Sequence, residues 1–281
     1  MIKKTKFCDI LNLFRSCLSA PSLQLFQKGA FSMSVNYHAF QSRNVLFPEA
    51  GAVCEQWRAA FAGYDPSRIA AILRLTYDAS FLYLSYFGAD YRLRLDTGVL
   101  EKRTEETPSE KEKSAAGHAA VGTLFPKSGR QEGPEAPSWT ENLYFNETMA
   151  IYHLLKYTKD QPRTSGIWVP NTELDGASIR SRQSDPLLTP FSLRFTGKTP
   201  LLRRQCEALG GHALPVKGDA AYLFYAFPQI PLRLIFWDAD EDFPAQTQVL
   251  VDSRITDYLH YESVGCVISD LLEKLEAGTS D

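Results

Sequence analysis

The sequence has few cysteines, and those it has are scattered rather than clustered. No two of its five cysteines form a CxxC pair. Iron–sulfur clusters and structural zinc sites need closely spaced ligands, so this spacing argues against both. It also argues against a disulfide framework, because scattered single cysteines are typical of reduced thiols in a cytoplasm. We therefore expect a cytoplasmic protein. The cysteines are Cys8, Cys17, Cys54, Cys206 and Cys266.

The chain also lacks an excess of basic residues and any long apolar segment. It has 30 Lys and Arg against 33 Asp and Glu, which gives a net charge of −3 and a pI of about 6.0. Nucleic-acid-binding surfaces are usually basic, so this balance predicts no nucleic-acid partner. No apolar run approaches the roughly 18 residues that a membrane-spanning helix needs. We therefore expect no membrane association.

Short catalytic motifs are absent as well. The sequence contains no GxSxG, HExxH or P-loop motif, and no GxGxxG follows an expected strand. Cys54 and Cys206 fall on apolar faces of expected helices, where a thiol is a poor nucleophile. His153 lies in the middle of another expected helix and is interpreted as a core or boundary residue. The sequence identifies neither a cofactor nor a reaction.

What the sequence has in quantity is apolar and aromatic residues. With 281 residues, 44% hydrophobic and 12% aromatic, the chain can bury a sizeable core. Tight hairpin turns outnumber crossover helices, which favours an α+β fold: a mainly antiparallel sheet with packed helices in a single globular domain. Apolar residues at helical spacing predict helices at 48–63, 145–157 and 199–210 and a last helix that ends before Gly278. The segment 171–198 is expected to be a loop.

Two segments depart from this globular pattern. Residues 1–32 begin with several lysines and are interpreted as a non-native or disordered extension ahead of Met33, the expected start. Residues 102–140 lose all apolar periodicity and are expected to be a disordered, charged insertion. The domain therefore divides into 33–101, with two helices and a three-stranded meander, and 141–281, its C-terminal α+β part.

The stretch from Ala220 to Asp252 carries the sharpest local pattern. Two apolar runs joined by a proline-bracketed turn predict a core hairpin, and an acidic cluster follows the second run. In an extended chain alternate carboxylates share one side, and oxygen-rich sites of this kind suit Mg²⁺ or Ca²⁺. The alternative is a solvated turn that Trp237 and Phe243 anchor to the core. The candidate ligand-binding residues here are Trp237, Asp238, Asp240, Glu241 and Asp242.

A second group of candidate ligand-binding residues follows shortly after the hairpin: Asp252, Asp257 and His260. Aspartate beside histidine can orient a base or hold a metal, although this spacing matches no standard motif. Asp252 could equally cap the next turn. Because this group follows the acidic cluster so closely, we expect any site to lie at the Trp237 end of the hairpin. The turn between its two apolar runs is the less favoured end.

Several segments of the chain resemble a known family. The run Pro231–Asp238, the acidic cluster and Leu250–Asp252 resemble the C-terminal signature of a prokaryotic family known as domain of unknown function 3786. Met149–Leu155 and Gly166–Val169 are similar to its middle part. The resemblance covers roughly residues 36–278, apart from the insertion. It implies a cytosolic protein, mostly of anaerobic bacteria and archaea. Some relatives carry an iron–sulfur segment, which implies metal- or corrinoid-linked metabolism, but this chain lacks the clustered cysteines.

The sequence leaves two main functions open. The first is a non-enzymatic binding or accessory module in anaerobic metabolism, whose acidic cluster engages a protein or small-molecule partner. The alternative is a metal-dependent enzyme, a hydrolase or a corrinoid-linked activity, that uses the region of Asp238, Asp252 and His260. The enzyme requires these residues and Asp240 to converge in one cleft. A third class, a purely structural subunit, predicts a large exposed apolar patch.

Overall fold

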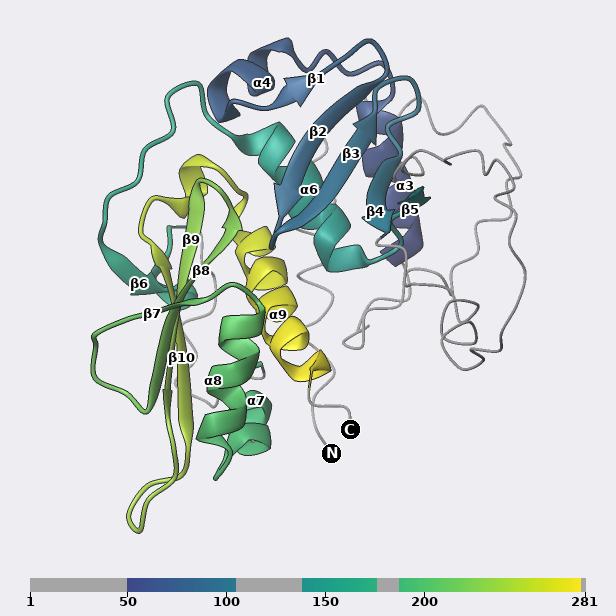
Figure 1. Cartoon of the computed structure of the whole chain (residues 1–281). Helices are drawn as coiled ribbons and strands as arrows, with labels where there is room; N and C mark the ends of the chain where they lie inside the picture. The colour runs from purple at the N-terminus through teal and green to yellow at the C-terminus, as the bar shows by residue number, and fades with distance from the viewer. Residues whose placement is uncertain (1–49, 105–137, 176–186, 279–281) are drawn as a thin grey trace, which may run out of the picture. The chain divides into compact units, whose positions relative to one another are not determined.

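The fold is α+β, as predicted from the sequence, and contains two antiparallel sheets (Figure 1). The computed structural model describes residues 50–104, 138–175 and 187–278. All of them belong to one compact unit, Tyr37–Asp281. The predicted extension at 1–32 and most of the predicted insertion, 105–137, lie outside the described residues.

The first sheet is a five-stranded antiparallel meander in the order β1-β2-β3-β4-β5. Buried and half-buried residues alternate along β2, as expected when one face of a sheet packs on the core. The meander is larger than the three strands predicted, because β4 runs on to Thr104 and pairs with β5, beyond the insertion. The strands are β1 (Thr76–Tyr77), β2 (Phe81–Tyr86), β3 (Ala89–Arg94), β4 (Leu100–Thr104) and β5 (Ser138–Glu141).

The second sheet is built around the predicted hairpin, which is confirmed. β8 pairs with β9 and β9 with β10, all antiparallel, within the sheet order β6-β10-β9-β8-β7. Phe224, Leu232, Phe236 and Val251 lie on the inner face and are at most 1% exposed. The strands are β6 (Trp168–Pro170), β7 (His212–Ala213), β8 (Ala220–Phe227), β9 (Ile230–Trp237) and β10 (Gln246–Asp252).

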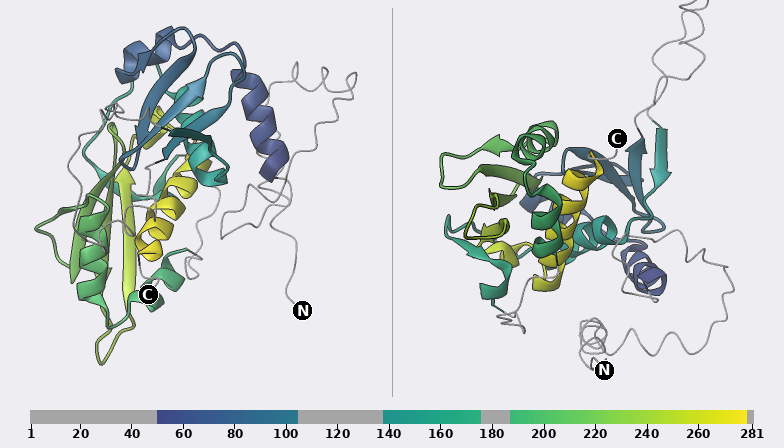
Figure 2. Two further views of the ribbon diagram at one scale, coloured as in Figure 1. Left: turned by 45° about the vertical axis from the view of Figure 1, so that its right-hand side comes forward. Right: turned by 90° about the horizontal axis from the view of Figure 1, so that it is seen from below.

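Helices pack against one face of each sheet and against one another (Figures 1 and 2). α7 contacts β10, α8 contacts β8, and α6 packs on α9. The apolar face predicted for the last helix is buried in α9, where Val264, Val267 and Leu271 are fully inaccessible. The helices are α3 (Ala50–Phe61), α4 (Ser67–Leu73), α6 (Phe145–Tyr157), α7 (Leu188–Phe195), α8 (Thr199–Ala208) and α9 (Tyr261–Ala277), with the 3₁₀ turns η3 (Asn171–Glu173) and η4 (Ile255–Asp257).

The prediction that 171–198 forms a loop is wrong, because α7 lies inside this segment. Phe191 and Phe195 fall one helical turn apart and are both buried. Pro190 obscured this pattern in the sequence. It occupies the first turn of α7, where the backbone N–H that proline lacks has no partner within the helix.

The two sheets meet at the turn between β2 and β3. Phe87 and Gly88 both have positive φ, 44° and 76°, as in the type I′ turn that suits a two-residue hairpin. The Phe87 backbone N–H donates to the carbonyl of Ala226 in β8 at 2.8 Å. The rings of Tyr86 and Phe227 lie 4.8 Å apart beside this bond. The bond holds Phe87 in a backbone conformation that bulky residues rarely adopt.

A buried ionic network ties the first sheet to α6 and α9. Glu147 on α6 accepts hydrogen bonds from Tyr91 at 2.7 Å, Lys102 at 3.1 Å and Lys274 at 2.7 Å. Burial opposes ionisation of Glu147, but the two lysines outweigh it and hold the pKa below its ordinary value. Glu147 is therefore a buried charge that two lysines neutralise within the protein.

Candidate functional site

Asp238, the first acid after β9, connects the end of β9 to the start of α8 through hydrogen bonds. Its carboxylate accepts hydrogen bonds from the Gly197 backbone N–H at 2.8 Å and from the Thr199 hydroxyl at 2.7 Å. Partial burial opposes ionisation, but these bonds outweigh it and lower the pKa of Asp238. The helix α8 begins at Thr199 after Lys198, and no side chain caps it.

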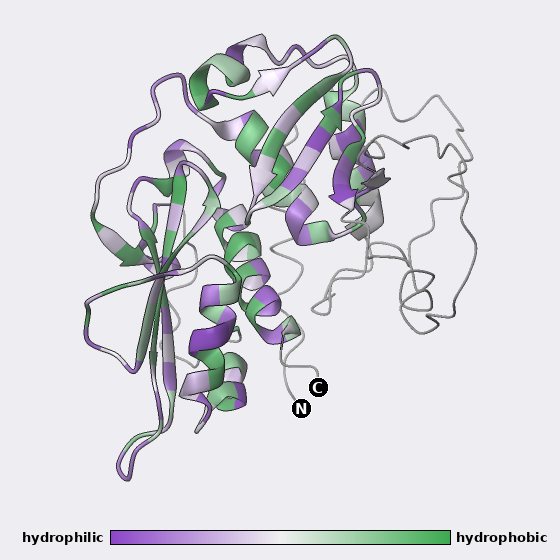
Figure 3. Cartoon of the chain, viewed as in Figure 1, coloured by the Kyte–Doolittle hydropathy of each residue, from purple (hydrophilic) through white to green (hydrophobic). Residues whose placement is uncertain are grey.

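The rest of the acidic cluster forms a closed turn, which we call the acidic tip (residues 239–244). The Asp240 carboxylate accepts the backbone N–H groups of Asp242 at 2.9 Å and Phe243 at 2.7 Å. The chain is therefore bent here, and the predicted extended geometry with carboxylates on one side does not occur. In the alternative left open by the sequence, Phe243 anchors the turn to the core, but its side chain is 65% exposed. The tip, which connects β9 to β10, projects beyond α7 and α8 (Figure 2), and its end is hydrophilic (Figure 3).

Asp252 lies at the other end of β10 and anchors the segment that precedes β6. It is 4% exposed, and its carboxylate accepts backbone N–H groups from Ser165 at 2.9 Å, Gly166 at 2.7 Å and Arg254 at 2.9 Å. Burial opposes ionisation, but these donors outweigh it and lower the pKa of Asp252. The alternative that Asp252 caps a turn is therefore what the geometry supports.

Asp257 has a similar structural role on the segment that follows α6. Its carboxylate binds Lys159 Nζ at 2.6 Å, the Arg163 backbone N–H at 3.2 Å and the Arg254 guanidinium at 3.0 Å. Burial again opposes ionisation, and the cationic donors again lower the pKa below its ordinary value. With its oxygens occupied in this way, Asp257 is poorly suited to act as a base.

His260 lies away from both aspartates' hydrogen-bond networks, in a cluster with α6. It is the N-cap residue of α9, and its ring centroid lies 6.0 Å from that of His153 and 5.2 Å from that of Tyr157. Its Nδ1 lies 3.5 Å from a carboxylate oxygen of Glu262. Burial lowers the pKa of His260 and raises that of Glu262 to about 7. Desolvation therefore favours the uncharged form of both side chains.

His153 completes this cluster and is 2% exposed, in keeping with its interpretation as a core residue. Its Nδ1 is hydrogen-bonded to the Ser263 hydroxyl. Burial lowers the pKa of His153 to about 3, so the ring is neutral. A serine beside a neutral histidine is the arrangement of an activated nucleophile, but Ser263 is 1% exposed, so no substrate could reach it. The cluster packs α6 on α9.

The predicted candidates therefore do not converge. Gln246 of β10 pairs with Trp237, and Asp252 lies six residues further along the strand. At roughly 3.3 Å per residue this places the two ends of β10 about 20 Å apart. Asp238 and Asp252 cannot belong to one cleft of catalytic size. In the three described ranges, no group of three or more His, Cys, Asp or Glu side chains could hold a metal ion.

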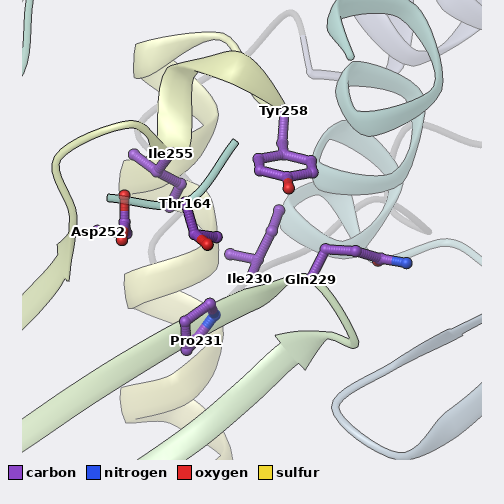
Figure 4. Close-up of a pocket in the computed structure, with 7 residues that line it drawn as sticks. All are labelled: Thr164, Gln229, Ile230, Pro231, Asp252, Ile255 and Tyr258. Carbon is purple, nitrogen blue, oxygen red and sulfur yellow. The ribbon is translucent and has the colours of Figure 1, made fainter. Parts of the chain in front are cut away.

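A shallow depression lies beside Asp252, at the end of the hairpin opposite to the one favoured from the sequence (Figure 4). It has essentially no room for even a water-sized molecule, whereas ligand pockets begin at roughly 300 Å³. Asp252 contributes carboxylate oxygens that are already hydrogen-bonded. The depression therefore offers no free reactive group. Its lining residues are Thr164, Gln229, Ile230, Pro231, Asp252, Ile255 and Tyr258.

Two residues that the sequence reasoning did not select stand out on the surface of the second sheet and its tip. Phe243 is the most exposed of the large apolar side chains in the described ranges. Arg233 is a single charge between Leu232 and Leu234 in β9. A lone charge in an apolar strand was the available signal for Arg233, since it marks the position where one face of the strand is left uncovered.

The fold and these surfaces define an α+β protein with two antiparallel sheets and no converged catalytic centre among the described residues. The chain belongs to the family described as Domain of unknown function (DUF3786), whose model matches residues 124–273. No curated protein and no solved structure matches the chain. None of the described helices has the length and apolarity to span a membrane.

Proposed function

We propose that this protein is a binding or accessory module that docks on a partner protein through the acidic tip. The observation that carries this proposal is the exposure of Phe243, 65%, on a turn surrounded by Asp240, Glu241 and Asp242. Such a tip fits an apolar pocket with a basic rim. The setting in prokaryotic anaerobic metabolism, which the family resemblance implied, remains part of the proposal.

The tip is already organised for binding before a partner arrives. The hydrogen bonds that Asp240 accepts from Asp242 and Phe243 fix the turn, and a bond from the Asp240 N–H to the Phe243 carbonyl at 3.0 Å closes it. A preformed turn loses less conformational entropy on binding than a flexible one. Burying the Phe243 ring contributes about 2 kcal/mol, and the acidic rim speeds encounter with a basic partner.

The metal-dependent enzyme is the less favoured function. It needs Asp238, Asp240, Asp252 and His260 in one cleft, whereas Asp238 and Asp252 lie at opposite ends of β10. The carboxylates of Asp238, Asp240 and Asp252 also accept hydrogen bonds from this chain's own N–H and O–H groups.

The test is site-specific photo-crosslinking in the native host, with the photoreactive residue placed at Phe243. Tyr144, which precedes α6, is a matched control, because it is 58% exposed and lies beside Lys102 of the first sheet instead of the second sheet. We expect one partner, identified by mass spectrometry, to be captured from position 243 and not from 144. Glu241→Lys with Asp242→Lys should abolish capture while Asp240 keeps the turn intact. Equal capture by both positions, or capture that survives the charge reversal, would contradict the proposal.

A further inference from the structure

Arg233 is a half-buried cation that has a shielded Nε–H and no carboxylate partner in the described part of the chain. It lies on β9, the middle strand of the second sheet, and its guanidinium carbon is 3.9 Å from the ring centroid of Trp168. The Arg233 Nε–H is inaccessible to solvent and has no hydrogen-bond acceptor among the described residues. A shielded N–H without an acceptor is unfavourable for the fold, so its presence needs a reason.

The residues directly beside Arg233 in register are apolar, whereas the polar Gln248 and Asp252 lie one pair away along β10. The strand register places Leu223 and Leu250 directly beside it on the same face, with Pro170 beyond Leu250. Tyr225 lies one row further along β8 and is 47% exposed. α7 and α8 pack against β10 and β8 from the side of the inward-facing residues. Arg233 therefore sits in the middle of an outer sheet face that we call the Arg233 face: Trp168, Pro170, Leu223, Tyr225, Arg233 and Leu250.

The carboxylate closest to Arg233 in register does not neutralise it. Asp252 pairs with Trp168 across β10 and β6, but its oxygens accept the N–H groups of Ser165 and Gly166. No carboxylate oxygen of the described ranges lies within 4.0 Å of the Arg233 guanidinium nitrogens. Stacking on the Trp168 ring offsets part of the lost hydration, but it leaves the Nε–H without an acceptor among the described residues.

We propose that the Arg233 face is a binding site for an acidic segment of a partner protein, with a carboxylate paired to Arg233. Guanidinium and carboxylate groups match each other with two parallel hydrogen bonds, which would satisfy the shielded Nε–H. An apolar side chain next to that carboxylate in the partner would lie on Leu223 and Leu250. The partner for this face is acidic, whereas the one proposed for the tip is basic, so the two proposals stand independently.

The open shape of the face favours a protein over a small molecule or a second copy through the same face. Small-ligand sites are concave and enclose most of their ligand, whereas a pleated sheet face is broad. Trp, Tyr and Arg are the residues that most often dominate binding at protein interfaces, and all three are present here. A symmetric dimer through this face would place Arg233 against itself, which is repulsive.

The experiment is a selection of random twelve-residue peptides displayed on phage, using the full chain as bait. Peptides that also bind the Arg233→Met variant are removed. We expect the enriched sequences to share an Asp or Glu beside a Leu, Phe or Ile. Failure to enrich any sequence, or enrichment of neutral or basic ones, would overturn the proposal.

A matched titration then tests the chemistry of the selected peptide. We expect its affinity to fall by about tenfold or more when its acidic residue becomes the amide, and by a similar factor in Arg233→Met. Arg233→Lys should also weaken binding, because lysine keeps the charge and loses the paired geometry. If inorganic phosphate at equal concentration displaces the peptide, the site is a simple anion site and the proposal fails. Concentration-dependent mass in sedimentation that Arg233→Met abolishes would instead make a second copy the occupant, and would overturn the choice of a separate partner.

Discussion

The outer face of each sheet carries an arginine that stacks on an aromatic side chain, but the two arginines differ in their carboxylate partners. On the first sheet, Arg92 stacks between Phe81 and Trp139, with its guanidinium carbon 4.0 Å and 4.5 Å from the ring centroids. Its Nε–H also donates to Glu101 at 2.5 Å. On the second sheet, Arg233 stacks on the Trp168 ring at 3.9 Å, and no carboxylate among the described residues pairs with it. The guanidinium of Arg92 is therefore paired within the protein, whereas the shielded Nε–H of Arg233 has no acceptor in the described ranges.

This difference separates stability from binding. A half-buried arginine whose charge is paired and whose stem is packed contributes to the fold, so its removal costs free energy. A shielded arginine without a partner contributes little or opposes folding, so its removal costs little and can even stabilise. We therefore expect substitutions in the first sheet to destabilise the protein and substitution of Arg233 not to.

The largest effect is expected at Gly98, where the first sheet meets α3. A Cβ on Gly98 would lie 2.1 Å from the Arg58 carbonyl oxygen, and Gly98 has a φ of 71°. Gly98→Ala should therefore lower the free energy of unfolding by about 3 kcal/mol or more, because backbone atoms must move. Urea unfolding followed by circular dichroism measures this loss.

Gly88→Ala is the matched control for this change. Gly88 has a φ of 76°, but a Cβ there meets nothing within 4 Å. Its cost should be only the conformational one, about 1 kcal/mol. Equal losses of unfolding free energy at the two glycines would show that the close approach of α3 to Gly98 does not cause the loss.

The next largest effect is expected at Arg92. Arg92→Met removes the ion pair with Glu101, whose side chain is 12% exposed, and the stacking on Phe81 and Trp139. We expect a loss of about 2 kcal/mol in the free energy of unfolding. Arg94→Met is the control, because Arg94 is 43% exposed and its contacts with Glu101 are longer, 3.6 Å. Exposed pairs contribute about 0.5 kcal/mol or less.

The contrast between satisfied and unsatisfied charge recurs among the carboxylates, and it gives a pH-dependent prediction. Burial raises the pKa of Glu262 to about 7, whereas a glutamate in the unfolded chain ionises near about 4.3. The folded state thus holds this proton more tightly, and the contribution of Glu262 to stability declines as pH rises from about 4.3 to about 7. At pH 8, Glu262→Gln should raise the free energy of unfolding by about 1–2 kcal/mol.

The same variant should show almost no gain at pH 4, where Glu262 is protonated in the folded state and mostly protonated in the unfolded one. Asp252→Asn should behave in the opposite way, because hydrogen bonds hold the pKa of Asp252 below its ordinary value. Its loss of stability should be present at pH 8 and shrink as pH falls through the lowered pKa of Asp252. Thermal melts of both variants across this range measure the two trends. A uniform effect of either substitution at all pH values would rule out the charge argument.

Much of the fold was accessible from the sequence because its signals are local. The apolar periodicity of α9 and of the hairpin from Ala220 to Asp252 depends on which residues face the core, and periodicity reports that directly. α7 was missed because Pro190 reads as a helix breaker until its place in the first turn is known. The pairing of β4 with β5 joins residues on both sides of a long insertion, which no local pattern reveals.

The candidate site was harder to predict, because it depends on contacts between distant segments. Asp238, Asp252 and Asp257 look like ligands in sequence, yet their partners, such as Gly197 and Ser165, lie far away along the chain. Because β10 runs antiparallel to β9, the chain also doubles back after the acidic cluster. Asp252 therefore lies at the turn end of the hairpin, although in sequence it follows the acidic cluster closely.

The smallest expected effect is also the most direct test of the central claim, that Arg233 is kept for binding and not for folding. The measurement is the free energy of unfolding of Arg233→Met by urea at neutral pH, beside wild type and Arg92→Met. We predict a value equal to wild type or up to about 1 kcal/mol higher, because the substitution removes a half-buried charge whose Nε–H has no acceptor among the described residues. A loss of about 2 kcal/mol, matching that expected for Arg92→Met, would contradict the account and make Arg233 a structural residue like its counterpart.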